Sequence, residues 1–355
     1  MPAKKSTPKL DLSPSVFHRR LMRGTEQKLA YRGEDVKLWQ RRLRRKLREL
    51  VGHVPARAGR VPLRVRSLWK QEHKLGSIEK IAFRAEPGSD ALAYVCLPKG
   101  AKPPYDFFIC LQGHSTGMHV SIARNRENEF KAIPPDDGDR DFALGCMRRG
   151  VAALCIEQRS FGLRREQLQE KVAKHGCLDA TMHSLLLGRT LIGERVFDVD
   201  RGIDYLASRG DCNMKTLGVM GNSGGGTISL FSAALLPRIR LAMPSCYFCT
   251  FADSIMSIYH CVDNYVPGLM LWAEMADVMG LFAPKPVVIV SGRKDPIFPF
   301  AGVQKAFRQL RKIYRAAGAA KHCHLVVGNE GHRFYARAAW EKMLRELRTL
   351  KEART

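Results

Sequence analysis

The strongest chemical motif in the sequence is a serine among glycines, GNSGGG at positions 221–226. The apolar run TLGVM precedes it directly, and the helix-like run TISLFSAALL follows the Ser-Gly core. A serine at a sharp strand-to-helix turn needs glycines two residues before and two residues after it, because the backbones approach closely there. Such a turn would raise the hydroxyl of Ser223 above a sheet edge as a nucleophile. A phosphate loop is excluded because no Gly-Lys-Ser/Thr follows.

A serine nucleophile needs a base, and the base needs an acid that orients it. The strand-like run KPVVIVSG leads to Asp295, and the strand-like run HCHLVVG leads to His332. The carboxyl ends of parallel strands meet at one edge of a sheet, so we expect Ser223, Asp295 and His332 to form a catalytic triad in that chain order. Asp253 as the acid and His114 as the base stay open as alternatives.

The oxyanion of a tetrahedral intermediate would need hydrogen-bond donors. We expect these donors to be the backbone N–H groups of Gly224 and His114. His114 lies in the loop after DFFICL, and we expect Gln112 to shape that loop and to contribute to substrate binding. The aromatic and Met-rich segment 246–282 could form a lid or pocket wall, or it could pack into the core. Its candidate substrate-binding residues are Tyr259, His260, Asn264 and Tyr265. We also expect Glu157 and Arg159 to form a structural ion pair.

The elements that must position these residues predict an α/β fold. Alternating runs over 62–98 predict an antiparallel β entry, and a helix is predicted at 34–51 from its apolar spacing. Further on, continuously apolar strand-like runs alternate with helix-like stretches, which is typical of a doubly wound, mostly parallel sheet. The predicted strands are 106–111, 150–157, 216–221, 239–245, 285–292 and 322–328. The predicted helices between and after them are 139–149, 191–209, 225–236, 299–317 and 333–352.

Taken together, these motifs resemble the α/β-hydrolase superfamily, and several further stretches resemble its dienelactone-hydrolase and acetyl xylan esterase-like branch of bacterial serine hydrolases. The stretches are LWQRRLRRKLRELVG, EQRSFGLR, LLGRTLIGERVFDVDRGIDYL, YHCVDNYVPG and SGRKDPIFP, and the resemblance covers roughly residues 36–350. One departure is the loop that reads Gln-Gly-His where many members have His-Gly followed by another residue.

The resemblance implies a serine esterase that acts on short-chain acyl esters, with acetyl esters and esters of carbohydrates as the favoured substrates. Dienelactone hydrolases carry a cysteine nucleophile, so Ser223 favours esterase chemistry. No metal or organic cofactor is required. A serine peptidase or amidase on the same triad is the alternative enzyme.

Composition narrows the class of protein. The chain has 355 residues, 45% hydrophobic and 26% charged, which is an ordinary globular mix. No run is long and apolar enough for a membrane span, and the N-terminus lacks the apolar core of a signal peptide. Several of the ten cysteines lie inside apolar strand-like runs, so we expect free thiols and a cytoplasmic protein. The Cys246–Cys249 pair has no second pair at zinc spacing, and we expect no metal site.

The formal net charge of +25 lies mostly in residues 1–60 and 301–355. We expect a basic N-terminal arm at 1–33, disordered or wrapped on the surface, followed by the hydrolase domain at 34–355. A nucleic-acid-binding protein is the non-enzymatic alternative. The motifs favour a small-molecule ester as the partner, with neither a membrane nor a nucleic acid, while a homo-oligomer stays open.

Overall fold

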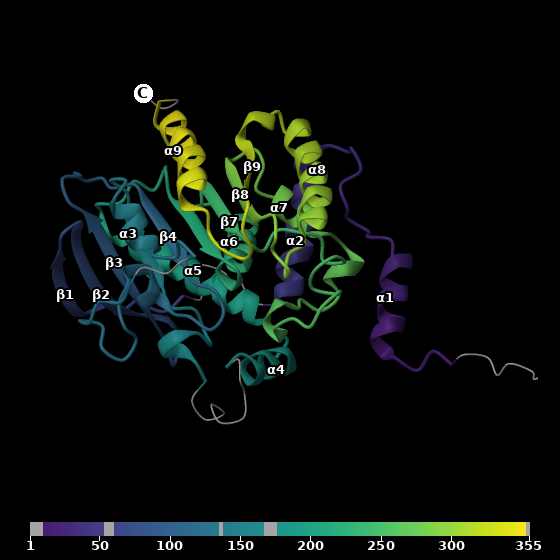
Figure 1. The fold of residues 1–355 in the computed structure, drawn as a ribbon, viewed down its shortest axis with the longest axis horizontal. Helices are drawn as coiled ribbons and strands as arrows, with labels where there is room; N and C mark the ends of the chain where they lie inside the picture. The colour runs from purple at the N-terminus through teal and green to yellow at the C-terminus, as the bar shows by residue number, and fades with distance from the viewer. Residues whose placement is uncertain (1–9, 53–59, 135–137, 167–175, 353–355) are drawn as a thin grey trace, which may run out of the picture.

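The computed structural model describes residues 10–52, 60–134, 138–166 and 176–352, and its centre is a nine-stranded sheet (Figure 1). The strands are β1 (Arg66–His73), β2 (Gly76–Glu86), β3 (Ser89–Pro98), β4 (Phe107–Leu111), β5 (Ala152–Ile156), β6 (Gly218–Asn222), β7 (Leu241–Ser245), β8 (Val287–Gly292) and β9 (Cys323–Gly328). Their spatial order is β1-β2-β3-β5-β4-β6-β7-β8-β9.

The pairing of the strands confirms the predicted sheet. β1, β2 and β3 form an antiparallel meander, and β3 pairs antiparallel with β5. From β5 through β4 to β9 every pair is parallel. The carboxyl ends of β4, β6, β7, β8 and β9 therefore lie along one edge, and the loops that follow them meet there.

Helices connect the parallel strands as the apolar periodicity predicts. The helices are α1 (Pro14–Gly24), α2 (Val36–Val51), α3 (Phe142–Met147), α4 (Leu178–Leu186), α5 (Leu191–Arg209), α6 (Gly224–Leu235), α7 (Met275–Gly280), α8 (Phe300–Ala316) and α9 (Ala336–Glu352). The five helices predicted beyond residue 138 correspond to α3, α5, α6, α8 and α9. The shorter α1, α4 and α7 were not predicted.

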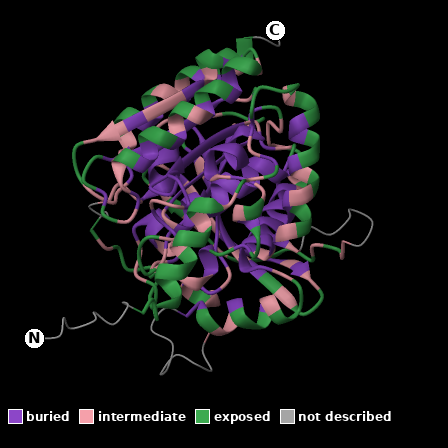
Figure 2. Cartoon of the chain, turned by 90° about the vertical axis from the view of Figure 1, so that its right-hand side faces the viewer, coloured by how far each residue is buried: buried purple, intermediate pink, exposed green. Residues whose placement is uncertain are grey.

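Alternating side chains of the sheet enter two separate cores. On β4, Phe107 and Ile109 pack into the larger core with α2, α5, α6, α7 and α8, whereas Phe108 and Cys110 pack into the smaller core with α3 and α9. Buried segments run through the middle of the molecule and the helices expose their outer faces (Figure 2). A sheet covered on both faces explains why its parallel strands read as continuous apolar runs.

Helix α2 shows how local sequence sets an element. The Asp35 carboxylate accepts a hydrogen bond from the Leu38 N–H at 2.7 Å, and Gly52 ends the helix in the left-handed conformation. Trp39 and Leu43 are buried in the larger core. Arg41 and Arg42 are exposed, while the half-buried Arg44 donates to the carbonyls of Ala234 and Leu281.

The N-terminal arm is more ordered than predicted, since residues 14–24 form α1, which stands away from the sheet in Figure 1. Ser13 caps it, and none of its residues is buried. After α1 the chain lies against the body, where the N–H groups of Lys28 and Leu29 donate to the carbonyls of Leu271 and Trp272. Residues 1–9 of the arm lie outside the described residues. Among the described residues, no helix has the length and apolarity needed to cross a bilayer.

The segment 246–282 combines both alternatives considered for it. Its first residues, including Phe248 and Cys249, and its last residues on α7 are buried in the larger core. Residues 257–259 between them are exposed. The ends of the segment therefore pack as core. Leu281 and Phe282 at its C-terminal end also line a pocket beside α2, and residues of its middle such as Ile255 and Tyr265 line another.

The buried face of α2 generates a stability prediction. Leu43→Ala removes a fully buried side chain and should lower the free energy of unfolding by about 2–5 kcal/mol. Leu38→Ala, on the same helix but 47% exposed, is the matched control and should change it by less than about 0.5 kcal/mol. Urea unfolding followed by circular dichroism measures both, and equal losses would contradict this packing.

Candidate active site

Ser223 lies at a strained turn between β6 and α6. Its backbone has φ +57° and ψ −121°, a left-handed conformation that is unusual for a residue with a side chain. The Ser223 N–H donates to the carbonyl of Ser245 at the end of β7, at 3.0 Å. Ser223 is half-buried while its neighbours are buried, so the turn exposes the serine at the sheet edge.

Close backbone approach explains the glycines around this serine. A Cβ on Gly221 would lie 2.5 Å from the carbonyl of Gly225, and a Cβ on Gly225 would lie 1.9 Å from the carbonyl oxygen of Leu111. Neither side chain could be accommodated without moving backbone. The strand-turn-helix context predicted for Ser223 is therefore confirmed, together with its steric reason.

Asp295 and His332 meet at the ends of β8 and β9. His332 Nδ1 lies 2.8 Å from Asp295 Oδ2, and the Asp295 side chain is fully buried. The other oxygen, Oδ1, accepts the N–H groups of Ile297 and Phe298 at 2.9 and 3.2 Å. The Phe298 ring stacks on the imidazole with centroids 5.9 Å apart. The carboxylate and the ring are thus held rigidly.

The opposite nitrogen of this imidazole is unused. His332 Nε2 is buried and has no hydrogen-bond partner among the described residues, Ser223 included. The alternative acid, Asp253, instead accepts a hydrogen bond from Thr250 Oγ1 at 2.6 Å. Ser245, whose carbonyl accepts the Ser223 N–H, is followed in the chain by Cys246. The sulfur of Cys246 lies within 4.8 Å of a nitrogen of His332 and a carboxylate oxygen of Asp295. The pair therefore lies beside the turn of Ser223.

The loop after β4 lies against the serine. A Cβ on Gly113 would be 3.0 Å from the Ser223 Cβ, and a Cβ on Gly224 would be 2.9 Å from the His114 ring. His114 is thereby placed at the first turn of α6, where the N–H groups have no partner within the helix. Its Nε2 lies 2.8 Å from an oxygen of Asp263, so this ring is engaged away from Ser223.

Gln112 is part of the scaffold of this loop. Its side-chain N–H₂ donates to Ser121 Oγ and to the carbonyl of Arg140, both at 2.7 Å. Its backbone carbonyl accepts a hydrogen bond from the side-chain amide of Gln158. Gln112 is 2% exposed. The amide donors that a substrate would need are therefore already used, while the predicted role in shaping the loop agrees with these contacts.

His260 lies close to the Asp295–His332 pair. Its ring contacts the edge of Phe298 at 5.5 Å between centroids, and Asn264 Nδ2 donates to its Nδ1 at 3.1 Å. Burial, together with the smaller effects of the nearby His114 and His332, lowers the pKa of His260 to about 4. The Nε2 of His260 is buried without a partner among the described residues, so a neutral imidazole is available beside the site.

The two tyrosines of the predicted pocket lie further out. Tyr259 is 84% exposed, and the Tyr265 hydroxyl donates to the carbonyl of Ile255 at 3.0 Å. Of the four candidate substrate-binding residues in segment 246–282, the structure brings His260 and Asn264 together near the pair and leaves Tyr259 at the surface.

The predicted ion pair between Glu157 and Arg159 is wrong. The Glu157 carboxylate accepts the N–H groups of Met118 and Leu163 at 2.9 and 3.1 Å, and burial raises its pKa to about 7. Arg159 turns away and binds Asp198 and two glutamates. Side chains two positions apart point to the same side only where the chain is an extended strand. β5 ends at Ile156, before Glu157 and Arg159, so these two side chains are free to point in different directions.

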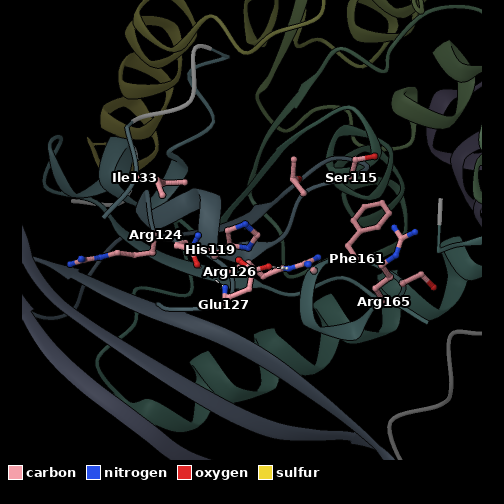
Figure 3. A pocket seen from close by; sticks show the side chains of 12 residues that line it. Ser115, His119, Arg124, Arg126, Glu127, Ile133, Phe161 and Arg165 are labelled. Atoms are coloured by element: carbon pink, nitrogen blue, oxygen red, sulfur yellow. Dashed lines mark hydrogen bonds and ion pairs between the residues drawn. The ribbon is translucent and has the colours of Figure 1, made fainter. Parts of the chain in front are cut away.

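A polar cavity of about 400 Å³ adjoins the loop after β4. Figure 3 shows it between the segments 115–119, 124–133 and 160–165, with Phe161 on one side and the side chains of Arg124 and Arg126 across it. Phe161 also contacts the ring of His114, with centroids 5.0 Å apart. The cavity therefore shares a wall with the loop over Ser223.

The chain is similar to a known protein over most of its length. No family model matches the chain. A curated Bacillus subtilis (strain 168) protein named "Putative hydrolase YtaP" is 26% identical over 295 residues, which cover 81% of this chain and 92% of that protein.

Solved esterase structures share the whole fold. A structure described as a putative acetyl xylan esterase from Bacteroides fragilis has a TM-score of 0.73 at 15% identity and covers 91% of this chain and 84% of that one. A glucuronoyl esterase from Solibacter usitatus has a TM-score of 0.62 at 15% identity, with 91% and 96% covered. The chain has the α/β-hydrolase fold. The resemblance inferred from the sequence motifs is thus confirmed at the level of the fold.

Two residues of this α/β-hydrolase site were missed in the sequence. Asp263 holds the ring of His114, and Arg195 on α5 donates to Asp263 Oδ2 at 2.6 Å, with both side chains buried. Arg195 follows Glu194 in a helix that also carries Arg201 and Arg209, so nothing in the local pattern singles out Arg195 as the arginine that binds Asp263.

The crowding at the serine turn predicts a large cost for a single methyl group. Gly225→Ala places Cβ against the carbonyl of Leu111 and should lower the free energy of unfolding by about 3 kcal/mol. Gly145→Ala is the matched control, because its Cβ would meet nothing closer than 3.7 Å, and it should change stability by less than about 1 kcal/mol. Chemical denaturation distinguishes the two, and a neutral Gly225→Ala variant would contradict the close approach.

The buried imidazole of His260 predicts a pH effect. Its pKa falls from 6.5 to about 4 on folding, so the unfolded chain binds the proton more readily between these values. Stability should therefore decrease as the pH falls through this window. Histidine ring NMR should show His260 titrating near pH 4, with the signal assigned by its loss in His260→Asn. A midpoint near 6.5 would contradict the burial of this ring.

Proposed function

We propose that this protein is a serine carboxylic-ester hydrolase. The single observation that carries the proposal is that a strained, half-exposed serine turn and a buried Asp295–His332 pair follow the carboxyl ends of strands in the same parallel sheet, with the outer nitrogen of His332 unpartnered among the described residues. Such an imidazole can accept a proton from a hydroxyl brought against it, and hydrogen bonds of this kind often form only when substrate is bound.

In the proposed first step, Ser223 Oγ attacks the ester carbonyl carbon while His332 Nε2 takes the hydroxyl proton. Asp295 holds Nδ1–H and stabilises the imidazolium that results. The tetrahedral intermediate then breaks its bond to the alcohol, which leaves with the proton from Nε2. The product of this half-reaction is an acyl ester of Ser223.

The negative charge of the intermediate is placed on the carbonyl oxygen, at the first turn of α6. We assign the N–H of Gly224 as one donor, because a first-turn N–H has no partner within its helix. The N–H of His114 is the second, supported by the close approach of its loop to Ser223 and by the fixing of its ring by Asp263. Each such donor contributes about 3 kcal/mol to the transition state.

Water completes the cycle. His332 Nε2 takes a proton from a water molecule, whose oxygen attacks the acyl carbon, and the bond to Ser223 Oγ then breaks as the serine regains a proton. A carboxylic acid leaves. The neutral imidazole of His260 lies beside this pair, and we propose it as a polar wall for the acyl or alcohol group.

We propose short acyl groups, acetyl above all, on a hydroxyl-rich alcohol such as a carbohydrate. Two of the structural relatives are described as a putative acetyl xylan esterase and a glucuronoyl esterase, which supports this choice of substrate class. The polar cavity beside the loop after β4 supports it as well, because its arginine, serine and threonine side chains can hydrogen-bond hydroxyl groups.

The protein is proposed to act in the cytoplasm on a small molecule. All ten cysteines lie within the described residues and form no disulfide there, which supports a reducing compartment. The separation into a basic arm at 1–33 and a hydrolase domain at 34–355 is also retained as a proposal.

Substitution of the triad tests the proposed activity. Ser223→Ala should lower the hydrolysis of p-nitrophenyl acetate by roughly 10⁴-fold or more, because the nucleophile is lost, and Asp295→Asn should lower kcat by roughly 10⁴-fold. Initial rates at saturating substrate measure both effects, and circular dichroism confirms that the variants fold.

Matched controls separate the alternatives. Ser208→Ala on α5 removes a serine outside the site and should keep the wild-type rate, and Asp253→Asn should as well if Asp295 is the acid. A panel from acetate to octanoate esters, an acetylated sugar and an aminoacyl amide defines the substrate. Faster turnover of the amide than of every ester would replace the esterase proposal with a peptidase or amidase.

A further inference from the structure

Four potential metal ligands from three separate segments converge behind the loop after β4. They come from that loop, from the residue before α4, and from the two ends of a short stretch at 261–263. The four side chains are His114, Cys177, Cys261 and Asp263. One ligand atom of each lies within 4.8 Å of the ligand atoms of all the others. We refer to them as the four-ligand cluster.

The chemistry of these donors favours zinc. Two thiols, an imidazole nitrogen and a carboxylate are the ligand types of tetrahedral zinc sites, whereas calcium and magnesium take oxygen ligands. His114 presents its Nε2 to the cluster at 2.8 Å from Asp263, which is the same nitrogen that a metal would use. Its other nitrogen, Nδ1, faces Gly224.

Two of the four ligands are buried and two are half-buried. Cys177 is 0% exposed and Asp263 is 2% exposed, whereas His114 and Cys261 are half-buried. Phe161 and Leu191 form a small apolar core around Cys177, and Cys261 packs against it. A thiolate of Cys177 in such an environment is costly without a cation.

The surrounding charges balance with a zinc ion present. Arg195 donates to Asp263 Oδ2 at 2.6 Å and approaches Cys177 Sγ at 3.8 Å. Together, Zn²⁺ and the guanidinium carry three positive charges, which two thiolates and one carboxylate neutralise.

Outer contacts orient the ligands as they do around known metal sites. Asn264 Nδ2 donates to Asp263 Oδ1 at 3.2 Å, and the Arg195 guanidinium lies 4.2 Å from the centre of the Phe161 ring. Arg195 also donates to the carbonyl of Arg159 at 2.8 Å. The carboxylate is therefore held in place from outside the cluster.

We propose that the four-ligand cluster binds one zinc ion that fixes the loop over Ser223. The ion would tie this loop to the start of α4 and to the segment 246–282, and would set the ring of His114 against Gly224. It does not touch the proposed nucleophile, so its role is positional. The proposal concerns zinc binding alone and does not depend on the proposed esterase activity.

Metal analysis tests the proposal directly. Tag-free protein is produced in zinc-supplemented medium and desalted. Inductively coupled plasma mass spectrometry should then find about one zinc ion per chain. Cys177→Ser and Cys261→Ser should lose it. Cys212→Ser, a half-buried thiol outside the cluster, is the matched control and should keep it. Circular dichroism checks that each variant folds.

A second measurement needs no variant. After removal of zinc with a chelator, Co²⁺ added to the wild-type protein should produce the thiolate charge-transfer band and the intense visible bands of tetrahedral cobalt, and Zn²⁺ should displace them. The proposal is overturned if folded wild-type protein supplied with Zn²⁺ contains none. It is equally overturned if the intact mass after alkylation shows a disulfide between Cys177 and Cys261, which would make the pair a redox couple.

Discussion

The close passage of the Ser223 turn against the end of β4 is the constraint on which the rest of the site depends. The backbone of Gly225 lies so near the carbonyl of Leu111 that a single added carbon would be 1.9 Å away. This contact forces Ser223 to a positive φ and places the loop after β4 directly over the serine. A strain of this kind persists only where the surrounding structure over-determines it, and here two parallel neighbours of β6 supply that support: β4 through Leu111, and β7 through the carbonyl of Ser245.

The three histidines around this turn differ in their hydrogen-bond partners. The carboxylate of Asp295 engages one nitrogen of His332, and Asp263 engages His114, while His260 has only the amide of Asn264. Burial lowers the pKa of His260 to about 4, and of the three rings only that of His332 is held by Asp295. The surrounding packing therefore gives three chemically identical side chains different partners within one site.

Buried carboxylates and arginines form ion pairs inside the protein. A protein with a net charge of +25 nevertheless buries several carboxylates, and arginines pair with three of them, Asp198, Asp200 and Asp263. Asp198 receives Arg159 and Arg164, and these hold its pKa below the ordinary value although burial acts to raise it. Removing one partner of such a pair leaves a buried charge unpaired, which is far more costly than losing an exposed pair. The arginines inside the protein are thus structural, in contrast to the lysine- and arginine-rich terminal segments.

The sequence by itself determined the order of strands and helices and the sharp turn at Ser223, because apolar periodicity and glycine spacing are local properties. It also pointed to Asp295 and His332, since the ends of parallel strands must share an edge, and their pairing in the structure agrees with that expectation. It did not reveal that Arg195 and Asp263 are buried together, that Glu157 and Arg159 point apart, or that Cys177 meets Cys261. Arg195 and Asp263 are 68 positions apart and Cys177 and Cys261 are 84 positions apart, across loops without periodicity. Only the packing of the folded chain decides which of many similar side chains are brought into contact.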